Sequence, residues 1–257
     1  MRGASALTAV VAAAGSGQRL GAGGPKAFVP LAGRPMIEWS LRALGRAAPV
    51  RAIVVAAPPG LVAELRGRLG AGGPVPVEVV AGGATRSRSV ANALAAVETE
   101  LVAIHDAARP LLRPQLVEAL VAALEADPEA AGAIAAAPVT DTIKRARPAG
   151  RGADGEELEV ESTVDRSTLW AAQTPQAFRL EALREALRVT EAERDAATDE
   201  AMLVEAAGGR VLIHPAGPEN LKVTTPHDLR VAELLLARRE GAPARGEANP
   251  LGSAGGC

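Results

Sequence analysis

The sequence contains little cysteine and few aromatic residues. Of its 257 residues, one is Cys, two are Phe, two are Trp and none is Tyr. The single cysteine, Cys257, excludes an internal disulfide and a cysteine-based zinc site. No apolar stretch reaches the roughly 18 residues that span a bilayer, and the apolar run near the N-terminus leads directly into glycines instead of a cleavage site. We therefore expect a cytoplasmic protein without a membrane partner.

Basic and acidic residues nearly balance, with 28 Lys and Arg against 30 Asp and Glu. The formal net charge of −2 gives no field that would attract nucleic acid or an anionic membrane. Only three of the basic residues are lysines, Lys26, Lys144 and Lys222. In a composition that favours Arg as the generic cation, each lysine is a candidate for a position that needs a compact ammonium group. Chance retention of a solvated lysine is the alternative.

Short β-rich runs alternate with helical periodicity along the chain. Strands are expected at residues 8–13, 51–57, 77–80, 101–105, 132–137 and 210–214. Helices are expected at residues 35–44, 61–69, 86–97, 114–124, 180–189, 199–207 and 226–236. This alternation predicts an α/β fold with a mostly parallel sheet, helices on both faces, and ligands at the carboxyl ends of the strands. One domain is expected over residues 1–239, followed by a disordered Gly/Ala/Pro-rich tail over 240–257.

A glycine-rich segment, residues 12–26, follows the first expected strand and carries Arg19 and Lys26. Glycines let phosphates approach the backbone amides, and the two cations supply positive charge that balances the negative charge of a nucleoside triphosphate. The spacing is not that of a P-loop, because Pro25 precedes Lys26 and Ala27 follows it, and it also departs from the dinucleotide fingerprint. We interpret the segment as a triphosphate loop. A merely flexible loop is the alternative.

Other polar residues fall where expected strands end or helices begin. Asp106 follows a buried strand and suits Mg²⁺ or a ribose hydroxyl, whereas Arg109 suits a phosphate. The turn from Gly83 to Ser89 opens a helix and can present amides and a hydroxyl to a base edge. Lys222 lies just before the last helix. Helix capping and simple surface exposure are the alternatives for these positions.

One segment, residues 144–161, is rich in Arg, Pro and Gly and then in acidic residues. It lacks the apolar content to bury itself, yet motif-like segments flank it. We predict a protruding hairpin, an arm over about residues 140–166, that packs on a second subunit to form a homodimer. A plain surface insertion is the alternative.

Several motifs occur together in a fixed order: Ala-Ala-Gly-x-Gly-x-Arg-Leu, Gly-Gly-x-x-Arg-x-x-Ser-Val, His-Asp-Ala-Ala-Arg-Pro, Ala-Pro-Val-x-Asp-Thr, Val-Asp-Arg, Gln-Thr-Pro-Gln-x-Phe, Thr-Asp-Glu-Ala and Glu-Asn-Leu-Lys-Val-Thr-Thr-Pro. This set, spread over roughly residues 7–236, resembles the 2-C-methyl-D-erythritol 4-phosphate cytidylyltransferase family of the non-mevalonate isoprenoid pathway. The resemblance implies a Rossmann-like nucleotidyltransferase sheet with a protruding β-arm that interlocks two subunits. It also implies an enzyme that transfers CMP from CTP to 2-C-methyl-D-erythritol 4-phosphate, releases pyrophosphate, and uses Mg²⁺.

The resemblance further implies roles for individual residues. The transition state and the triphosphate would be held by Arg19 and Lys26, and the sugar phosphate would be positioned by Arg166 and Lys222. The cytidine would contact Ala13, Ala14, Gly15, Gly83 and Ser89. The acceptor side would be lined by Asp106, Arg109, Thr142 and Thr198. Asp106 is also the candidate metal ligand, with Mg²⁺ held mainly through the CTP phosphates. Ala84 departs from the pattern, since some members carry an acidic residue there, and this leaves base selectivity less secure.

Three alternative functions stay open at this point. A cytidylyltransferase acting on ribitol 5-phosphate would share the glycine loop and both Lys26 and Lys222. A dinucleotide-dependent reductase is disfavoured by the glycine spacing and by the lack of an acidic residue closing the second strand. A catalytically silent nucleotide-binding protein is disfavoured because the cations for both substrates are present.

Overall fold

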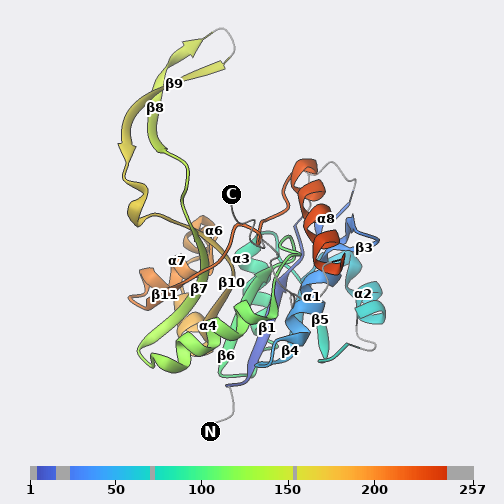
Figure 1. The fold of residues 1–257 in the computed structure, drawn as a ribbon. Helices are drawn as coiled ribbons and strands as arrows, with labels where there is room; N and C mark the ends of the chain where they lie inside the picture. Colours follow the sequence, from blue (N-terminus) through green and yellow to red (C-terminus); the bar gives the residue numbers. More distant parts are fainter. Residues whose placement is uncertain (1–4, 16–23, 70–72, 153–154, 242–257) are drawn as a thin grey trace, which may run out of the picture.

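The computed structural model describes residues 5–15, 24–69, 73–152 and 155–241. At its centre lies a seven-stranded sheet in the order β11-β7-β10-β6-β1-β4-β5 (Figure 1). The strands are β1 (Leu7–Ala12), β4 (Val50–Ala57), β5 (Val77–Ala81), β6 (Leu101–Asp106), β7 (Ala130–Pro138), β10 (Trp170–Arg179) and β11 (Arg210–Pro215). Neighbouring strands are parallel except at β10, which runs antiparallel to both β6 and β7. The predicted mostly parallel sheet is confirmed.

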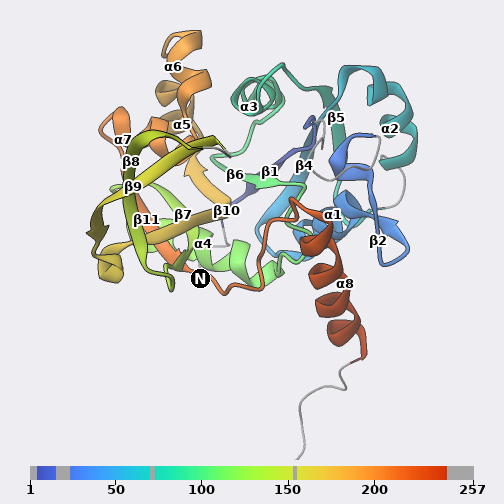
Figure 2. The same cartoon turned by 90° about the horizontal axis from the view of Figure 1, so that it is seen from above.

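Helices cover both faces of this sheet (Figure 2). They are α1 (Met36–Arg46), α2 (Val62–Leu69), α3 (Arg86–Leu94), α4 (Pro114–Ala126), α5 (Leu180–Ala186), α6 (Glu191–Ala196), α7 (Glu200–Ala206) and α8 (Pro226–Gly241). The apolar clusters place α1, α2 and α4 on one face and α3, α5 and α7 on the other. Two short strands, β2 (Pro30–Leu31) and β3 (Arg34–Pro35), pair beside α8. The layers are those expected from alternating strands and helices.

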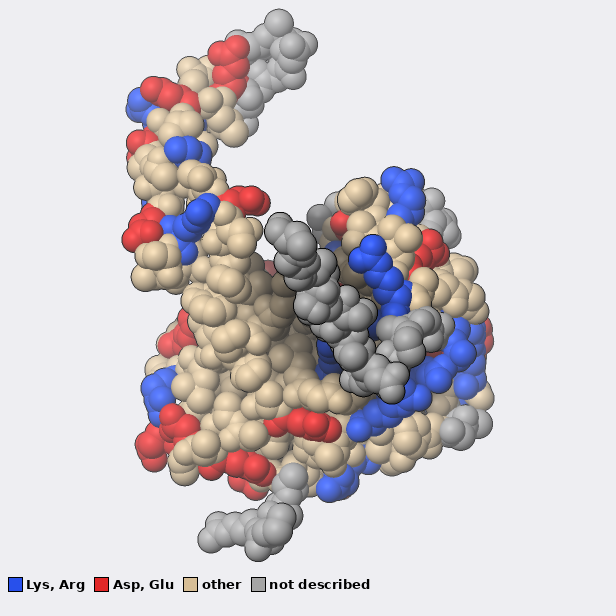
Figure 3. Space-filling view, in the orientation of Figure 1, with Lys and Arg blue, Asp and Glu red and all other residues tan. Residues whose placement is uncertain are grey.

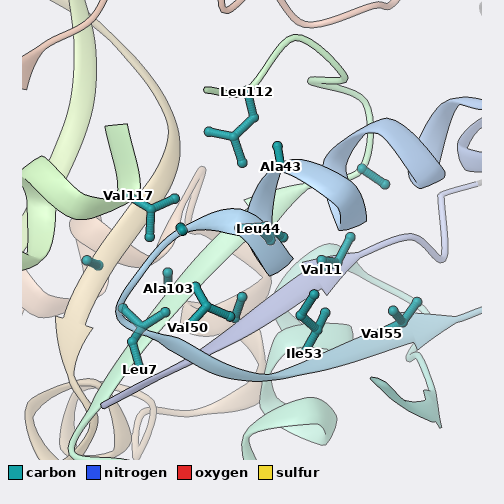
Figure 4. Packing of buried hydrophobic residues seen from close by; sticks show 14 of the residues in the cluster. Leu7, Val11, Ala43, Leu44, Val50, Ile53, Val55, Ala103, Leu112 and Val117 are labelled. Atoms are coloured by element: carbon teal, nitrogen blue, oxygen red, sulfur yellow. The ribbon is translucent and has the colours of Figure 1, made fainter. Parts of the chain in front are cut away.

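Strand β1 shows why the sheet must be covered on both sides. Leu7 and Val11 point into the cluster under α1 and α4, shown in Figure 4, whereas Val10 points into the opposite cluster. All three are fully buried. Because side chains alternate along a strand, a continuous apolar run has to be buried on two faces. Each such side chain contributes roughly 1.5–3 kcal/mol relative to exposure.

The predicted arm is present as the antiparallel hairpin β8 (Ile143–Gly152) and β9 (Gly155–Val164). It rises from the carboxyl edge of the sheet, well away from the body of the protein (Figure 1). Lys and Arg side chains and Asp and Glu side chains alternate along it (Figure 3). Within the hairpin, Ala146 pairs with Val160 and Pro148 with Leu158.

Strand β10 and helix α6 are elements that the sequence analysis did not predict. The segment Gln173-Thr174-Pro175 breaks the apolar pattern of strand β10, and the register of β10 against β7 shifts between Ala172 and Gln176, so no continuous apolar pattern marks this strand. Helix α6 has no buried residue and therefore no apolar periodicity. Its one sequence signal is the capping box formed by Thr190 and Glu193.

The last helix, α8, continues to Gly241, beyond its predicted end at residue 236, so residues 240–241, predicted to begin the disordered tail, are helical. The remainder of the predicted tail lies outside the described residues.

Candidate active site

A pocket of about 610 Å³ opens at the carboxyl ends of β1 and β6. Its lining includes Ala13, Ala14 and Gly15, which continue the chain from β1. The Ala13 amide donates to the Ala56 carbonyl oxygen at 2.9 Å, which anchors this segment to β4. The pocket therefore lies at the end of the central parallel strands, where α/β sheets bind their ligands.

The base of the pocket that faces α3 is built from glycine backbone and one buried hydroxyl. The Gly83 amide donates to Ser89 Oγ at 3.0 Å, and that hydroxyl donates to the Thr85 carbonyl oxygen at 2.9 Å. A Cβ on Gly82 would lie 2.6 Å from Ala14 Cβ, so only glycine fits there. Gly83 and Ser89, both predicted to contact the cytidine, line the pocket together with Ala84.

The pocket also receives two of the three lysines. Lys26 begins a short 3-10 helix (Lys26–Phe28), and its amide donates to the Gly15 carbonyl oxygen at 3.4 Å. Lys222 comes from the loop before α8. Arg19, the other cation predicted for the triphosphate, lies outside the described residues.

Asp106 lies between two cations at the end of β6. Lys222 Nζ is 2.7 Å from Asp106 Oδ2, and Arg86 Nε donates to Asp106 Oδ1 at 2.9 Å. Burial opposes the charged form of this carboxyl group, but Arg86 and Lys222 outweigh burial and hold its pKa well below its usual range. Asp106 is therefore an ionised carboxylate in the pocket wall.

Behind Asp106 lies a buried hydrogen-bonded layer. The Asp106 amide donates to Thr174 Oγ1 at 3.0 Å, and Thr174 Oγ1 lies 3.3 Å from His105 Nδ1. His105 Nε2 is 3.2 Å from the Arg109 carbonyl oxygen, so this nitrogen carries the proton and Nδ1 accepts from Thr174. Burial lowers the pKa of His105 to about 4, which keeps the ring neutral at pH 7. His105 supports the backbone of the site and is not a proton donor to it.

Arg109 is placed beside the pocket and not in its lining. The side chain is buried, and Nη1 donates to the Asn220 carbonyl oxygen at 2.7 Å. Asn220 Nδ2 in turn donates to Gln173 Oε1 at 2.8 Å and to the Thr174 carbonyl oxygen at 2.9 Å. In this structure Arg109 therefore fixes the loop that carries Lys222.

Three other predicted acceptor residues lie away from the pocket lining. Thr142 is exposed just before β8, and Arg166, at the foot of the arm, donates to the Thr140 carbonyl oxygen. Thr198 is exposed before α7, with its hydroxyl 3.9 Å from Met202 Sδ. A single chain thus brings together Lys26, Lys222 and Asp106 but leaves these three residues outside the pocket.

A family model described as 2-C-methyl-D-erythritol 4-phosphate cytidylyltransferase (IspD) matches this chain over residues 7–238. The chain belongs to the IspD family. A relative from Synechococcus sp. (strain CC9902) with this enzyme's name is 43% identical over 232 residues, covering 90% of this chain and 97% of the relative. One from Ralstonia nicotianae is 44% identical over 239 residues, covering 89% and 91%.

Solved structures agree with this membership. The enzyme of the same name from Thermus thermophilus is 32% identical, with a TM-score of 0.68 and coverage of 90% of this chain and 98% of that one. The synthase from Anaerococcus prevotii is 25% identical, with a TM-score of 0.75 and coverage of 91% and 100%. The predicted resemblance and the Rossmann-like nucleotidyltransferase fold are confirmed.

The activity of this IspD-family chain is cytidylyl transfer. CTP and 2-C-methyl-D-erythritol 4-phosphate give 4-diphosphocytidyl-2-C-methyl-D-erythritol in isoprenoid biosynthesis, with pyrophosphate as the second product. The reductase and the silent binding protein are therefore set aside, and the relatives' names favour methylerythritol phosphate over ribitol 5-phosphate. In the described part of this IspD-family chain, no helix is both long and apolar enough to cross a membrane.

The residue-level prediction for this family member missed Arg86 and Glu200. Arg86 lines the pocket and bridges Asp106 to Glu200, which is fully buried at the start of α7. Both residues lie inside motifs quoted above, Gly-Gly-x-x-Arg and Thr-Asp-Glu-Ala. At Glu200 the available signal was an acid at a helix start, which the helix dipole explains equally well, and at Arg86 it was a cation at a helix start, where the dipole disfavours one.

Proposed function

We propose that the described pocket carries out the transfer by positioning and charge neutralisation. The observation that supports this is the meeting of Lys26 and Lys222 with an ionised Asp106 in one pocket beside the glycine backbone. Both substrates are polyanions, so the main barrier to their approach is electrostatic repulsion. Fixed ammonium groups in a partly enclosed pocket lower that barrier without having to reorganise.

In the proposed mechanism, an oxygen of the acceptor phosphate attacks the α-phosphorus of CTP in line with the departing group. A phosphorus–oxygen bond to the acceptor forms, the bond from the α-phosphorus to the bridging oxygen breaks, and pyrophosphate leaves with the electron pair. A phosphate monoester is already an anionic nucleophile, so the pocket needs no general base. This agrees with the neutral, inward-facing His105.

We assign the two ends of the pocket to the two substrates. The amides and hydroxyl around Gly83 and Ser89, with Ala13 to Gly15, receive the cytidine, and Lys26 lies toward the triphosphate. Lys222, held by Asp106, faces the acceptor phosphate. The Lys222 loop is fixed from behind by Arg109 and Asn220, which keeps the ammonium group in the pocket.

The pocket also suits Mg²⁺ as a cofactor. Asp106 is the one acidic residue among the described pocket-lining residues, and no cluster of three or more His, Cys, Asp or Glu residues that could hold a metal occurs in the described ranges. Magnesium commonly binds through one or two carboxylates together with substrate phosphates, and this donor set fits that pattern. When bound, the ion would neutralise phosphate charge and would be held mainly by the CTP phosphates. Both Asp106 oxygens already contact a cation, Arg86 or Lys222, so Asp106 would add at most one shared contact.

The arm supports a homodimer. Leu158 and Val160 are 66% and 58% exposed, and their hairpin partners Pro148 and Ala146 extend the same apolar face. Ordering a protruding hairpin costs conformational entropy, and an apolar face exposed to water does not offset that cost. Burial of this face against another surface would offset it. Pairing through the arm would also cover its foot, where Thr142 and Arg166 lie outside the single-chain pocket.

A cytoplasmic location is supported by the use of CTP.

The assignment of the cations is tested by steady-state kinetics of pyrophosphate release with both substrates varied. Lys26→Ala should mainly lower kcat, whereas Lys222→Ala should mainly lower kcat/KM for the acceptor. Arg68→Ala is the matched control, because it removes an exposed cation that pairs with Glu38, and neither residue lines the pocket. Unchanged kinetics for both lysine variants would overturn the assignment.

A further inference from the structure

Glu200 is a buried carboxylate that has no direct role in the transfer mechanism proposed above. It is the first residue of α7, it has no exposed surface, and it does not line the pocket. Both of its oxygens lie 2.7 Å from Arg86 Nη1. Buried ion pairs contribute little to stability compared with apolar residues of similar volume, because the desolvation of both charges offsets their attraction. Stability alone therefore gives no physical reason for this pair.

Arg86 uses two different nitrogens for two carboxylates. Nη1 is bound to Glu200, while Nε donates to Asp106 Oδ1 at 2.9 Å. The other oxygen of Asp106, Oδ2, lies 2.7 Å from Lys222 Nζ. The contacts thus run in one line from a fully buried acid on α7, through α3 and the end of β6, to an ammonium group in the pocket.

The guanidinium group is suited to this bridging position. Its planar fork presents several donors in fixed directions, so binding Glu200 with one nitrogen sets the direction of the other. A lysine offers one compact ammonium and cannot hold both carboxylates in this geometry. Lys222, by contrast, has a flexible stem with 42% of its side chain exposed, and it needs a fixed counterion to occupy one position.

We propose that Glu200 and Arg86 are positioning residues for the acceptor half of the reaction. Glu200 fixes Arg86, Arg86 fixes Asp106, and Asp106 holds the Lys222 ammonium where the acceptor phosphate arrives. This inference rests on the proposed role of Lys222. Its distinct consequence is that Glu200 acts only through Lys222, so the effect of changing Glu200 depends on whether Lys222 is present.

A double-mutant cycle tests this dependence. Glu200→Gln should lower kcat/KM for the acceptor by about tenfold, while the Kd for CTP, measured by calorimetry, changes by less than about twofold. In a Lys222→Ala background the same substitution should cost less than about twofold. Glu191→Gln is the matched control, since Glu191 pairs with Arg88, two residues from Arg86 on the same helix, on the exposed surface. It should match the wild type in both backgrounds.

Arg86→Lys provides a second variant if Glu200→Gln does not fold. Arg86 is partly exposed, and Arg86→Lys keeps the charge while losing the fork. It should show the same loss and the same dependence on Lys222.

Three outcomes would overturn the inference. Equal losses in the presence and absence of Lys222 would show that Glu200 and Arg86 have a purely structural role. A lower melting temperature with unchanged kinetics would show the same. If Lys222→Ala alone has wild-type kcat/KM for the acceptor, the proposed role of Lys222 fails, and the inference fails with it for that separate reason.

Discussion

Lys222 Nζ lies 2.7 Å from Asp106 Oδ2, which joins the loop before α8 to the end of β6 inside the pocket. The contact fixes the position of the Lys222 ammonium group, whose side chain is otherwise flexible. Because Asp106 also pairs with Arg86, its single negative charge only partly neutralises Lys222. In the proposed mechanism, an arriving acceptor phosphate therefore meets an ammonium group that is already oriented. For the reaction with the acceptor, the position and shape of the Lys222 cation should therefore matter as much as its charge.

The first prediction concerns that geometry. Lys222→Arg keeps the positive charge but replaces a compact ammonium with a planar fork. We expect kcat/KM for the acceptor to fall at least about tenfold, equivalent to about 1.4 kcal/mol. Lys144→Arg, at an exposed lysine bound to Thr163 on the arm, is the matched control and should retain wild-type kinetics. Wild-type rates for Lys222→Arg would show that charge alone is sufficient.

The second prediction concerns the triphosphate end. Lys26→Ala removes a cation placed beside the glycine segment. Loss of one preorganised charge donor costs on the order of 3 kcal/mol in the barrier, so kcat should fall by about 10²-fold or more. The acceptor KM should change much less. A change confined to the acceptor KM would mean that Lys26 serves the other substrate.

The third prediction tests the close packing of Gly82 beside the proposed cytidine end of the pocket. In Gly82→Ala the new Cβ would lie 2.6 Å from Ala14 Cβ and 3.2 Å from the Ala57 carbonyl oxygen. Backbone must shift to relieve this contact, so we expect CTP affinity, measured by calorimetry, to fall at least about tenfold. Gly60→Ala is the control, because a Cβ there has no neighbour within 4 Å. Equal CTP affinity in both variants would remove Gly82 from the site.

The fourth prediction addresses the arm. Replacing Leu158 and Val160 together by Glu should prevent dimerisation, because it places two charges on the exposed apolar face. Light scattering measures the mass directly. Glu157→Gln, in the same strand, is the control and should stay dimeric. A double variant with the mass and activity of the wild type would reduce the arm to a surface insertion.

The fifth prediction concerns acid stability at the start of α8. Asp228 accepts hydrogen bonds from the Thr224 and Thr225 amides and the Thr224 hydroxyl. Burial is the largest single influence and opposes its charge, but the hydrogen bonds from Thr224 and Thr225 together outweigh burial and lower its pKa to about 2 from an ordinary value of 3.8. Since the folded-state pKa is depressed, the stabilisation is complete above the unfolded-state value and is lost as the pH falls toward 2.

Urea unfolding measures this effect. Asp228→Asn should lower the free energy of unfolding at pH 7, and the difference from wild type should shrink as the pH falls from about 4 toward 2. Glu233→Gln, exposed on the same helix, serves as the control. A difference that is constant with pH would assign the effect to packing and not to the charge of Asp228.

The spacing of apolar residues along the chain was sufficient to predict most of the strands and helices. Buried strands such as β1 and β4 are mostly apolar, and the expected bounds differ from the observed ones by one residue at most. Strand β10 was missed because polar residues interrupt it, yet this strand supplies Thr174, which supports Asp106. Its place between β6 and β7 depends on tertiary pairing that no local window contains.

The site was predictable in its parts and not in its connections. The ordered motifs identified Lys26, Asp106 and Lys222, and the pocket brings these three together. Arg109 was expected in the pocket, but its side chain turns inward to Asn220. The contact of Glu200 with Arg86 could not be foreseen, because it joins the starts of two helices from distant parts of the chain. Such long-range ion pairs leave no spacing pattern in the sequence.

The most direct test of the central claim is pyrophosphate release by the purified protein with Mg²⁺. Each of the four nucleoside triphosphates is offered with either 2-C-methyl-D-erythritol 4-phosphate or ribitol 5-phosphate, and the cytidylylated product is identified by mass. We predict turnover only when CTP, methylerythritol phosphate and the divalent ion are all present. Equal turnover with ribitol 5-phosphate, or with a purine triphosphate, would contradict the account.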